Sequence, residues 1–211
     1  MSAVFERDPE RIEKLSLDII SRELSGKNLD PRNEDIIKRV IHTTADFDYA
    51  DNLFFSEGAA KKGVDALGNK CTIVTDTEMA RAGINKKTLE SLGCNAVCFM
   101  SDSEVAVEAK ERGVTRAWVS MERACDIEGD IIFAIGNAPT ALISIHELFK
   151  TLRLSPVLVI AVPVGFVNVV EAKELIIGSD MPVIAARGNK GGSTVAAAIV
   201  NALMYRITRK R

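Results

Sequence analysis

From residue 71 to the end of the chain, short runs of β-branched and apolar residues alternate with segments long enough to form helices. The runs occupy residues 71–74, 96–100, 131–135, 157–162 and 183–186. The segments that fit helices are 103–112, 140–151, 171–175 and 193–206. Such alternation is typical of a parallel sheet with helices on both faces, so it predicts an α/β fold.

The first 70 residues carry a helical periodicity instead. Residues 9–24 place apolar side chains on one helical face, namely Ile12, Leu15, Ile19, Ile20 and Leu24. A second helix is expected after Pro31, reaching its last turn near His42, with a buried side formed by Ile36, Ile37, Val40 and Ile41. Residues 49–67 form a further amphipathic stretch, whereas residues 115–127 fit either a helix or a short strand. Five predicted strands favour a doubly wound, flavodoxin-like parallel sheet against which these N-terminal helices pack.

Size and charge narrow the function classes. A chain of 211 residues with 47% hydrophobic content suits a single domain over residues 1–211. The net charge of −2 provides no general attraction to nucleic acid or to an anionic membrane surface. The longest apolar stretch, 157–170, is interrupted by Pro163 and Gly165 and is too short to span a bilayer. An anionic ligand would therefore have to be held by local groups.

The N-terminus and the cysteines both indicate the cytoplasm. Charged residues stand at the N-terminus where a signal peptide needs an apolar run, so secretion is not expected. The four cysteines form no CxxC pair, and with only two histidines in the chain we expect no structural zinc. We expect reduced thiols in a cytoplasmic protein.

Unusual residues follow the predicted strands at the ends where ligands bind in open α/β sheets. Residues 75–79 follow the first strand, and the sequence GNAPT at 136–140 follows the third. The sequence PVGF at 163–166 follows the fourth strand, and RGNKGGST at 187–194 follows the fifth. We therefore expect a binding site along this rim of the sheet.

The last of these loops has the composition of an anion site. Its glycines allow close approach of the backbone, and Ser193 or Thr194 can cap the helix that follows. Arg187 and Lys190 add positive charge beside the helix N-terminus. The loop lacks the spacing of a Walker A motif. A glycine-rich turn with a good cap remains the alternative, and the GNAPT loop likewise has residues suited to starting a helix.

His42 stands at the predicted end of the second helix. A helix C-terminus favours the protonated imidazole, and Asp46, Asp48 and Asp51 lie near in sequence. These features suit a proton donor that works near neutral pH. A helix-end cap is the alternative interpretation. His146, inside the helix expected at 140–151, has no such neighbours, and we expect it to be structural.

Taken together, these segments resemble the precorrin-8X methylmutase family. The matching motifs are IKRVIHTTADFD at 37–48, TDT at 75–77, AGINK at 82–86, GNAPTAL at 136–142 and PVGFV at 163–167. KGGS at 190–193, followed by VAAAIVNAL at 195–203, completes the set. The resemblance runs from about residue 12 to residue 205, in the order found in the family.

The resemblance implies a flavodoxin-like homodimer that moves a methyl group from ring carbon 11 to ring carbon 12 of a corrin precursor in vitamin B12 biosynthesis. His42 matches the catalytic proton donor of the family. The residues that match motifs implied to line the substrate pocket are Ser16, Thr75, Gly83, Asn85, Lys86, Arg116, Asn137, Lys190 and Ser193. The HTTADFD form resembles the cobalt-precorrin-8 branch of the anaerobic pathway, so cobalt would belong to the substrate, with no cofactor and no protein-bound metal. Handover of product to the next pathway enzyme stays open.

Three positions depart from the family pattern. Asn168 stands where the family has glycine, and Ala172 stands where it has serine, which puts a ligand contact from either position in doubt. Asn189 occupies a position that is often basic, which removes one carboxylate partner.

The implied chemistry agrees with the residues present. A corrin precursor is a broad apolar ring fringed with carboxylates, which Met79, Pro163, Val164 and Phe166 could face while Lys86, Arg116, Arg187 and Lys190 clamp its edge. A methyl shift needs orientation and one acid, worth roughly 10²–10⁴-fold in rate. Two alternatives stay open: a non-catalytic tetrapyrrole carrier, and a flavodoxin-like protein that binds flavin or nucleotide.

Overall fold

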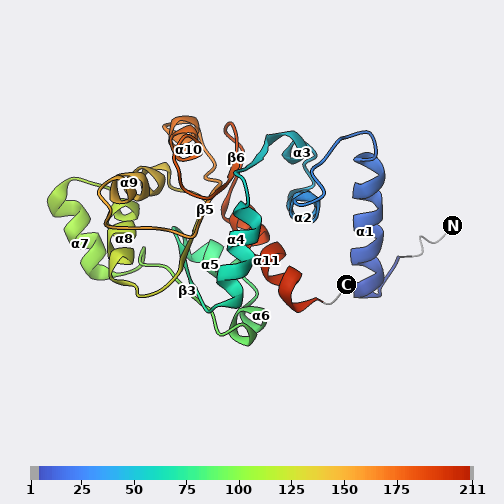
Figure 1. Cartoon of the computed structure of the whole chain (residues 1–211), viewed down its shortest axis with the longest axis horizontal. Coiled ribbons are helices and arrows are strands. Elements are labelled where there is room, and N and C mark those ends of the chain that lie inside the picture. The colour runs from blue at the N-terminus through green and yellow to red at the C-terminus, as the bar shows by residue number, and fades with distance from the viewer. Residues whose placement is uncertain (1–4, 210–211) are drawn as a thin grey trace.

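A six-stranded sheet forms the centre of the molecule in the computed structural model, which describes residues 5–209 (Figure 1). The strands are β1 (Leu53–Phe55), β2 (Thr72–Thr75), β3 (Asn95–Val97), β4 (Ile131–Ile135), β5 (Leu158–Ala161) and β6 (Val183–Ala186). Their spatial order is β1-β6-β5-β4-β2-β3, and every neighbouring pair is parallel except β1 with β6. The predicted α/β class is confirmed, but the predicted count of five strands is wrong by one.

The additional strand lies inside the stretch 49–67 that was expected to be helical throughout. This stretch contains a short helix, α3 (Tyr49–Asn52), then β1, and then α4 (Ala59–Gly68). Leu53 pairs with Ala186 and Phe55 pairs with Ile184 on β6. An apolar run of three residues carries no periodicity of its own, so pairing with the edge of the sheet decides its conformation.

Residues 5–209 form nine further α-helices. They are α1 (Pro9–Glu23), α2 (Glu34–Thr44), α5 (Glu78–Gly83), α6 (Lys86–Ser91), α7 (Ser103–Arg112), α8 (Arg116–Arg123), α9 (Pro139–Lys150), α10 (Val169–Ile177) and α11 (Ser193–Thr208). The ambiguous stretch at 115–127 is the helix α8 followed by one 3-10 turn, and Thr115 caps α8 by accepting a hydrogen bond from the Trp118 N–H. The short helices α5 and α6 were not predicted.

Alternate strand residues point to opposite faces of the sheet, and each face has its own core. On one face, Ile132 and Ile160 pack among residues of α2, α4 and α11. On the other face, Phe133 and Val159 pack among residues of α8, α9 and α10. This arrangement explains why the strands read as continuous apolar runs rather than alternating ones.

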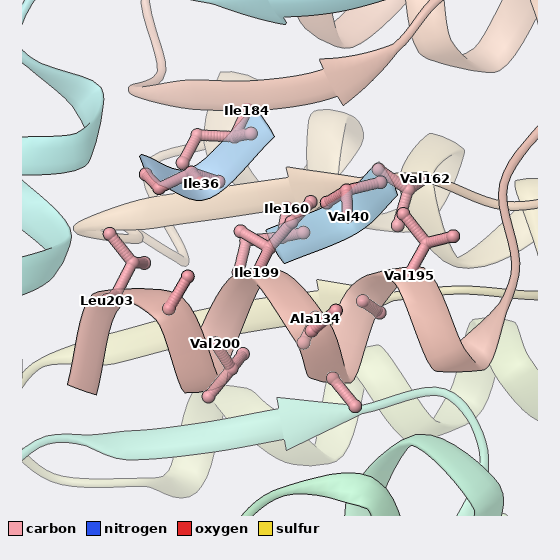
Figure 2. Packing of buried hydrophobic residues seen from close by; sticks show 14 of the residues in the cluster. Ile36, Val40, Ala134, Ile160, Val162, Ile184, Val195, Ile199, Val200 and Leu203 are labelled. Carbon is pink, nitrogen blue, oxygen red and sulfur yellow. The ribbon is translucent and has the colours of Figure 1, made fainter. Parts of the chain in front are cut away.

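The second N-terminal helix packs against the sheet, as expected, whereas the first stands outside it. Figure 2 shows Ile36 and Val40 of α2 lying close to Ile160 and Ile199. Helix α1 packs on α2 and buries Ile20 and Leu24. The remaining members of the predicted apolar face, Ile12, Leu15 and Ile19, are 44%, 43% and 54% exposed.

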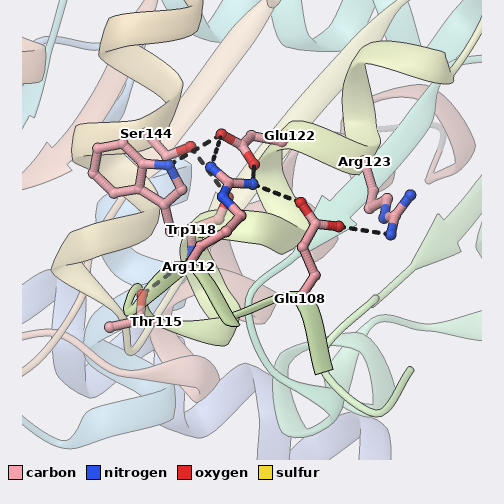
Figure 3. Close-up of polar contacts among 7 residues, drawn as sticks. All are labelled: Glu108, Arg112, Thr115, Trp118, Glu122, Arg123 and Ser144. Atoms are coloured by element: carbon pink, nitrogen blue, oxygen red, sulfur yellow. Dashed lines mark hydrogen bonds and ion pairs between the residues drawn. The ribbon is translucent and has the colours of Figure 1, made fainter. Parts of the chain in front are cut away.

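A charged network joins α7 to α8 (Figure 3). The Arg112 guanidinium donates to Glu108 at 2.6 Å and to Glu122 at 2.5 Å. The Trp118 indole N–H also donates to Glu122, at 3.1 Å, and Arg123 donates to Glu108 at 2.8 Å. The network is on the surface of these helices, so its contribution is to their mutual packing.

Candidate active site

The loops that follow β2, β4, β5 and β6 meet at one edge of the sheet and are bonded to one another. The hydroxyls of Thr77 and Ser193 share a hydrogen bond of 2.8 Å. The Gly192 N–H donates to the carbonyl of Val162 at 2.8 Å. We call this assembly the rim: residues 75–79, 136–140, 163–167 and 187–194.

Asp76 holds the GNAPT loop from inside. This fully buried carboxylate accepts hydrogen bonds from the backbone N–H groups of Gly136, Asn137 and Ala138 at 2.8, 2.7 and 2.6 Å. Burial raises the pKa of Asp76, while the three N–H donors favour the ionised carboxylate and act in the opposite direction. Sequence analysis did not single out Asp76 from its neighbours. Its position directly after a buried strand was the only available sign.

Two glycines of the rim are required by close backbone contacts. A Cβ atom on Gly136 would lie 2.6 Å from the Cα of Ser193, and one on Gly191 would lie 2.1 Å from the carbonyl oxygen of Val162. Neither neighbour is a flexible side chain, so neither can move aside. The start of α11 is therefore packed directly onto the loops after β4 and β5.

Lys173 holds the last loop from below in the same way. Its side chain is fully buried, and its Nζ donates to the carbonyls of Gly188 and Lys190 at 2.8 Å each. Burial lowers the pKa of Lys173 to about 8. Sequence analysis did not mark this lysine either, because its burial on α10 depends on the packing of the loop above it.

His42 lies in the last turn of α2 and is partly buried. The helix ends at Ala45, which has a φ of 54° and donates its N–H to the Ile41 carbonyl at 2.7 Å. Just beyond this cap, Asp46 and Asp48 both accept hydrogen bonds from Lys190 at 2.6 Å. The segment that follows His42 is therefore tied to the last loop of the rim.

The three aspartates expected to favour the protonated imidazole are paired with lysines instead. Lys190 takes Asp46 and Asp48, and it holds the pKa of Asp46 below its usual range. Asp51 pairs with Lys27. No ion pair within residues 5–209 includes His42. The three carboxylates are therefore engaged by lysines and not by His42.

Four of the residues implied to bind substrate lie at the rim or beside it. Ser193 and Lys190 belong to the last loop, and Asn137 is exposed on the GNAPT loop. Arg116 is exposed at the start of α8 and donates to the Met100 carbonyl at 3.4 Å. The preceding residue, Thr115, shares a 2.8 Å hydrogen bond with Thr140, which brings this helix end to the GNAPT loop.

Thr75 and Ser16 use their hydroxyls for backbone contacts. Thr75 is fully buried at the end of β2, and its single hydroxyl proton is directed at the carbonyls of Thr77 and Val97, which lie 3.1 and 3.3 Å from the hydroxyl oxygen. Ser16 lies on α1 and donates to the carbonyl of Ile12 at 2.9 Å. In this chain Thr75 shapes the rim from within rather than presenting an exposed group.

Gly83, Asn85 and Lys86 lie along α11 and not at the rim. A Cβ on Gly83 would meet the Cβ of Ala197 at 2.8 Å, so this glycine permits α5 to pack on α11. The Asn85 N–H donates to the Asn201 side chain at 2.8 Å, and Lys86 follows at the exposed start of α6. Asn201 is eight residues beyond Ser193, about 12 Å along the helix. In a single copy of the chain, Asn85 therefore lies about two helical turns of α11 away from Ser193.

Of the side chains expected to contact the ring at the rim, the apolar Met79 and Phe166 are exposed, whereas the basic Arg187 is already bonded within the chain. Met79 is 67% exposed and Phe166 is 91% exposed, which leaves apolar surface open at this edge. Arg187 is engaged: its guanidinium bonds Glu174 at 3.1 Å and lies 5.1 Å from the centre of the Phe54 ring. Arg187 is thus a poorer clamp for a carboxylate than its sequence position suggested.

Two of the three departures from the family pattern, Asn168 and Asn189, have local structural explanations. Asn168 has a φ of 59° at the residue before α10, a left-handed conformation that asparagine tolerates better than most residues other than glycine. Asn189 donates its side-chain N–H to the Gly165 carbonyl at 2.7 Å, while the Gly165 N–H donates to the Asn189 carbonyl at 3.2 Å. Asn189 therefore joins two loops of the rim.

A cavity of about 840 Å³ lies away from the rim, between α1, α2 and the end of α11, where Arg39, Tyr205 and Arg206 contribute to its wall. Among residues 5–209, no group of three or more His, Cys, Asp and Glu side chains is arranged to hold a metal ion. Within the same residues, no helix combines the length and apolar character needed to cross a membrane.

Several known proteins are similar to this chain in sequence and in fold. Residues 11–206 match the family described as Precorrin-8X methylmutase. The chain is 45% identical over 207 residues to the cobalt-precorrin-8 methylmutase of Salmonella typhimurium, covering 95% of this chain and 97% of that protein. It is 34% identical over 200 residues to the precorrin-8X methylmutase of Pseudomonas aeruginosa, covering 93% and 95%. The crystal structure of precorrin-8x methyl mutase from Thermus thermophilus matches with a TM-score of 0.86 and 33% identity, over 93% of this chain and 97% of that one. The chain belongs to the precorrin-8X methylmutase family.

Proposed function

We propose that this protein is an isomerase of vitamin B12 biosynthesis that moves a methyl group from ring carbon 11 to ring carbon 12 of precorrin-8 or cobalt-precorrin-8. The product is hydrogenobyrinic acid or its cobalt-containing counterpart, cobyrinic acid. The observation that carries the proposal is the link from Lys190 to the segment after His42, in a chain related to methylmutases along nearly its whole length. This link joins a histidine at a helix end to the glycine-rich loop beyond the parallel strands.

His42 acts as the proton donor in this proposal. Protonation of the ring by His42 next to the migrating methyl withdraws electrons from the conjugated system. The bond from the methyl to ring carbon 11 then breaks as its bond to ring carbon 12 forms, and the ring returns a proton to His42, so the product is an isomer of the substrate. One positioned acid contributes roughly 10²–10⁴-fold to such a step. Orientation of the ring on the rim supplies a further part of the rate. No redox partner is needed, because the electrons are redistributed within the substrate.

The carboxylates of the ring are bound at its edge by charged and polar side chains. We assign this role to the residues implied by the family motifs: Ser16, Thr75, Gly83, Asn85, Lys86, Arg116, Asn137, Lys190 and Ser193. Thr75 and Gly83 act through the backbone they shape, since one is buried and the other packs on α11. Met79 and Phe166 offer apolar surface to the ring face. Cobalt, when present, enters as part of the substrate, and the reaction uses no separate cofactor.

The finer fold and the assembly complete the proposal. Numbered among themselves, the parallel strands β2 to β6 have the order 2-1-3-4-5, which supports a flavodoxin-like core extended by β1. The exposed apolar side chains of α1 support a homodimer, because such a face is covered in most stable proteins. The four free cysteines are compatible with the reducing cytoplasm. Transfer of the product to the next enzyme of the pathway would use the exposed Phe166 side of the rim.

The activity is tested by incubating the protein with metal-free and with cobalt-loaded precorrin-8 and recording absorption spectra. We expect the colour change that accompanies altered conjugation with at least one of the two. Binding without any spectral conversion would indicate the tetrapyrrole carrier instead. Co-purification of a yellow flavin, with no affinity for the corrin precursor, would indicate the flavin or nucleotide binder.

The role of Lys190 is tested by Lys190→Ala. Asp46 and Asp48 take two of the three Lys190 N–H donors, which leaves the third for a ring carboxylate. Losing that charge-assisted contact should weaken binding by about 1.5–3 kcal/mol, or roughly 10- to 150-fold. Titration of the ring's absorption measures the affinity. Lys110→Ala on α7 is the matched control, because Lys110 is exposed and belongs to none of the rim loops. Unchanged affinity in Lys190→Ala would mean that the last loop only caps α11.

A further inference from the structure

We propose that Lys173 is a positioning residue for His42, acting through the backbone and side chain of Lys190. The proposal rests on the proposed function of His42 as the proton donor. It assigns to a buried side chain of α10 the task of setting the histidine of α2, more than 120 residues earlier in the chain.

The amine of Lys173 lies in an unusual environment. The side chain is fully buried, yet no carboxylate among residues 5–209 lies within ion-pair distance of its Nζ. Its partners are two carbonyls, those of Gly188 and Lys190, at 2.8 Å each. A buried amine is costly unless it is well bonded. Burial accordingly lowers the pKa of Lys173 to about 8.

These two hydrogen bonds fix the backbone of the last loop. Both carbonyls are turned toward Lys173 Nζ, so the Gly188–Asn189 and Lys190–Gly191 peptide groups are fixed. Asn189 itself is bonded twice to Gly165, at 2.7 and 3.2 Å. The backbone from Gly188 to Lys190 is thus held from below by α10 and from the side by the neighbouring loop. Glycine-rich segments without such bonds sample many conformations.

The side chain of Lys190 connects this loop to the segment after His42. Its backbone is fixed by Lys173, and its Nζ bonds Asp46 and Asp48 at 2.6 Å each. Asp46 in turn donates its backbone N–H to the hydroxyl of Thr44 at 3.3 Å, within the last turn of the helix that carries His42. A continuous set of contacts therefore joins Lys173 to the helix end of His42.

Lys173→Met provides the direct test, because methionine fills a similar volume without a charge or a donor. The chain has two histidines, so the imidazole signals in an NMR spectrum report on His42 and, as an internal reference, on His146 of α9. We expect the His42 signals to shift or broaden while those of His146 stay unchanged. We also expect kcat for conversion of the corrin precursor to fall by about 10- to 100-fold, since small misplacements of catalytic groups have effects of this size. Lys110→Met is the matched control and should leave both readouts at wild-type values.

A folded Lys173→Met variant with wild-type His42 signals and wild-type kcat would overturn the proposal. If that variant does not fold, the double variant Asp46→Asn/Asp48→Asn decides, because it breaks the same connection at two surface positions. Moved His42 signals and a lower kcat in the double variant support the connection, whereas unchanged signals and rate overturn it. Failure of the proposed function looks different: His42→Ala would convert substrate at the wild-type rate, while the His42 signals would still respond to Lys173→Met.

Discussion

Gly136 shows how a single residue sets the geometry of the rim. The backbone of Gly192 and Ser193 passes so close that a Cβ on Gly136 would lie 2.6 to 2.9 Å from their atoms. We expect Gly136→Ala to push the start of α11 away from the GNAPT loop and to lower the free energy of unfolding by about 1–3 kcal/mol. Thermal or urea denaturation measures the change.

The matched control for this substitution is Gly68→Ala at the end of α4, where an added Cβ meets nothing within 4 Å. This variant should be neutral or stabilised by up to about 1 kcal/mol, because alanine is the better helix former. If Gly136→Ala were as stable as its control, the contact between the GNAPT loop and α11 would be looser than the structure indicates.

Residues of the rim differ in how well the sequence predicts them. The helical spacing before His42 and the glycines after the last strand are local patterns, and both lie where those patterns place them. Asp76 and Lys173 were not predicted. Their importance comes from complete burial and from bonds to backbone groups about 60 and 15 residues away, which no local pattern reveals.

Substituting Glu122 measures how much the charged network between α7 and α8 contributes to the free energy of unfolding. The Arg112 guanidinium and the Trp118 N–H hold the pKa of Glu122 below its usual range. A carboxylate with a lowered pKa stabilises the fold at pH values above its unfolded pKa of about 4.3 and loses this contribution as the pH falls through its folded value. Because the pair is partly solvated, we expect Glu122→Gln to lower the free energy of unfolding by no more than about 1 kcal/mol at pH 7.

The difference between wild type and Glu122→Gln should disappear when unfolding is measured in the acid range, below the folded pKa of Glu122. Glu111→Gln on the neighbouring helix α7 serves as the control, since Glu111 has no ion-pair partner among residues 5–209. Its free energy of unfolding should equal that of the wild type at either pH. A difference for Glu122→Gln that persists in acid would show that the network of Figure 3 does not act through the carboxylate charge.

Helices several turns long were predicted close to their observed bounds, whereas one short strand and two short helices were missed. Helices α7, α9 and α11 begin and end within two residues of the predicted bounds. The strand β1 and the helices α5 and α6 were missed. They have three or six residues each, too few to show a periodicity, and pairing with β6 or packing on α11 determines them.

At the scale of the whole molecule, the proposed homodimer depends on the outward face of α1. Ile12, Leu15 and Ile19 lie one or two turns apart on a helix that packs on α2 by its other side. We expect light scattering after gel filtration to give a mass near twice 22.9 kDa for the wild type. Leu15→Glu should shift the mass toward that of one chain, because a buried charge at an interface is costly.

Leu152→Glu is the control for the assembly, since Leu152 is 92% exposed in a turn after α9 and away from α1. It should leave the mass unchanged. A wild-type mass of one chain at all concentrations would contradict the homodimer, and so would a Leu15→Glu variant that keeps the doubled mass.

In the proposed mechanism, His42 donates a proton to a ring that other groups bind. The most direct measurement compares His42→Ala with the wild type in two assays, titration of the corrin precursor and its rate of conversion at saturating concentration. We predict unchanged affinity and a rate lower by about 10²–10⁴-fold, the usual contribution of a general acid. Conversion by His42→Ala at the wild-type rate would contradict the claim.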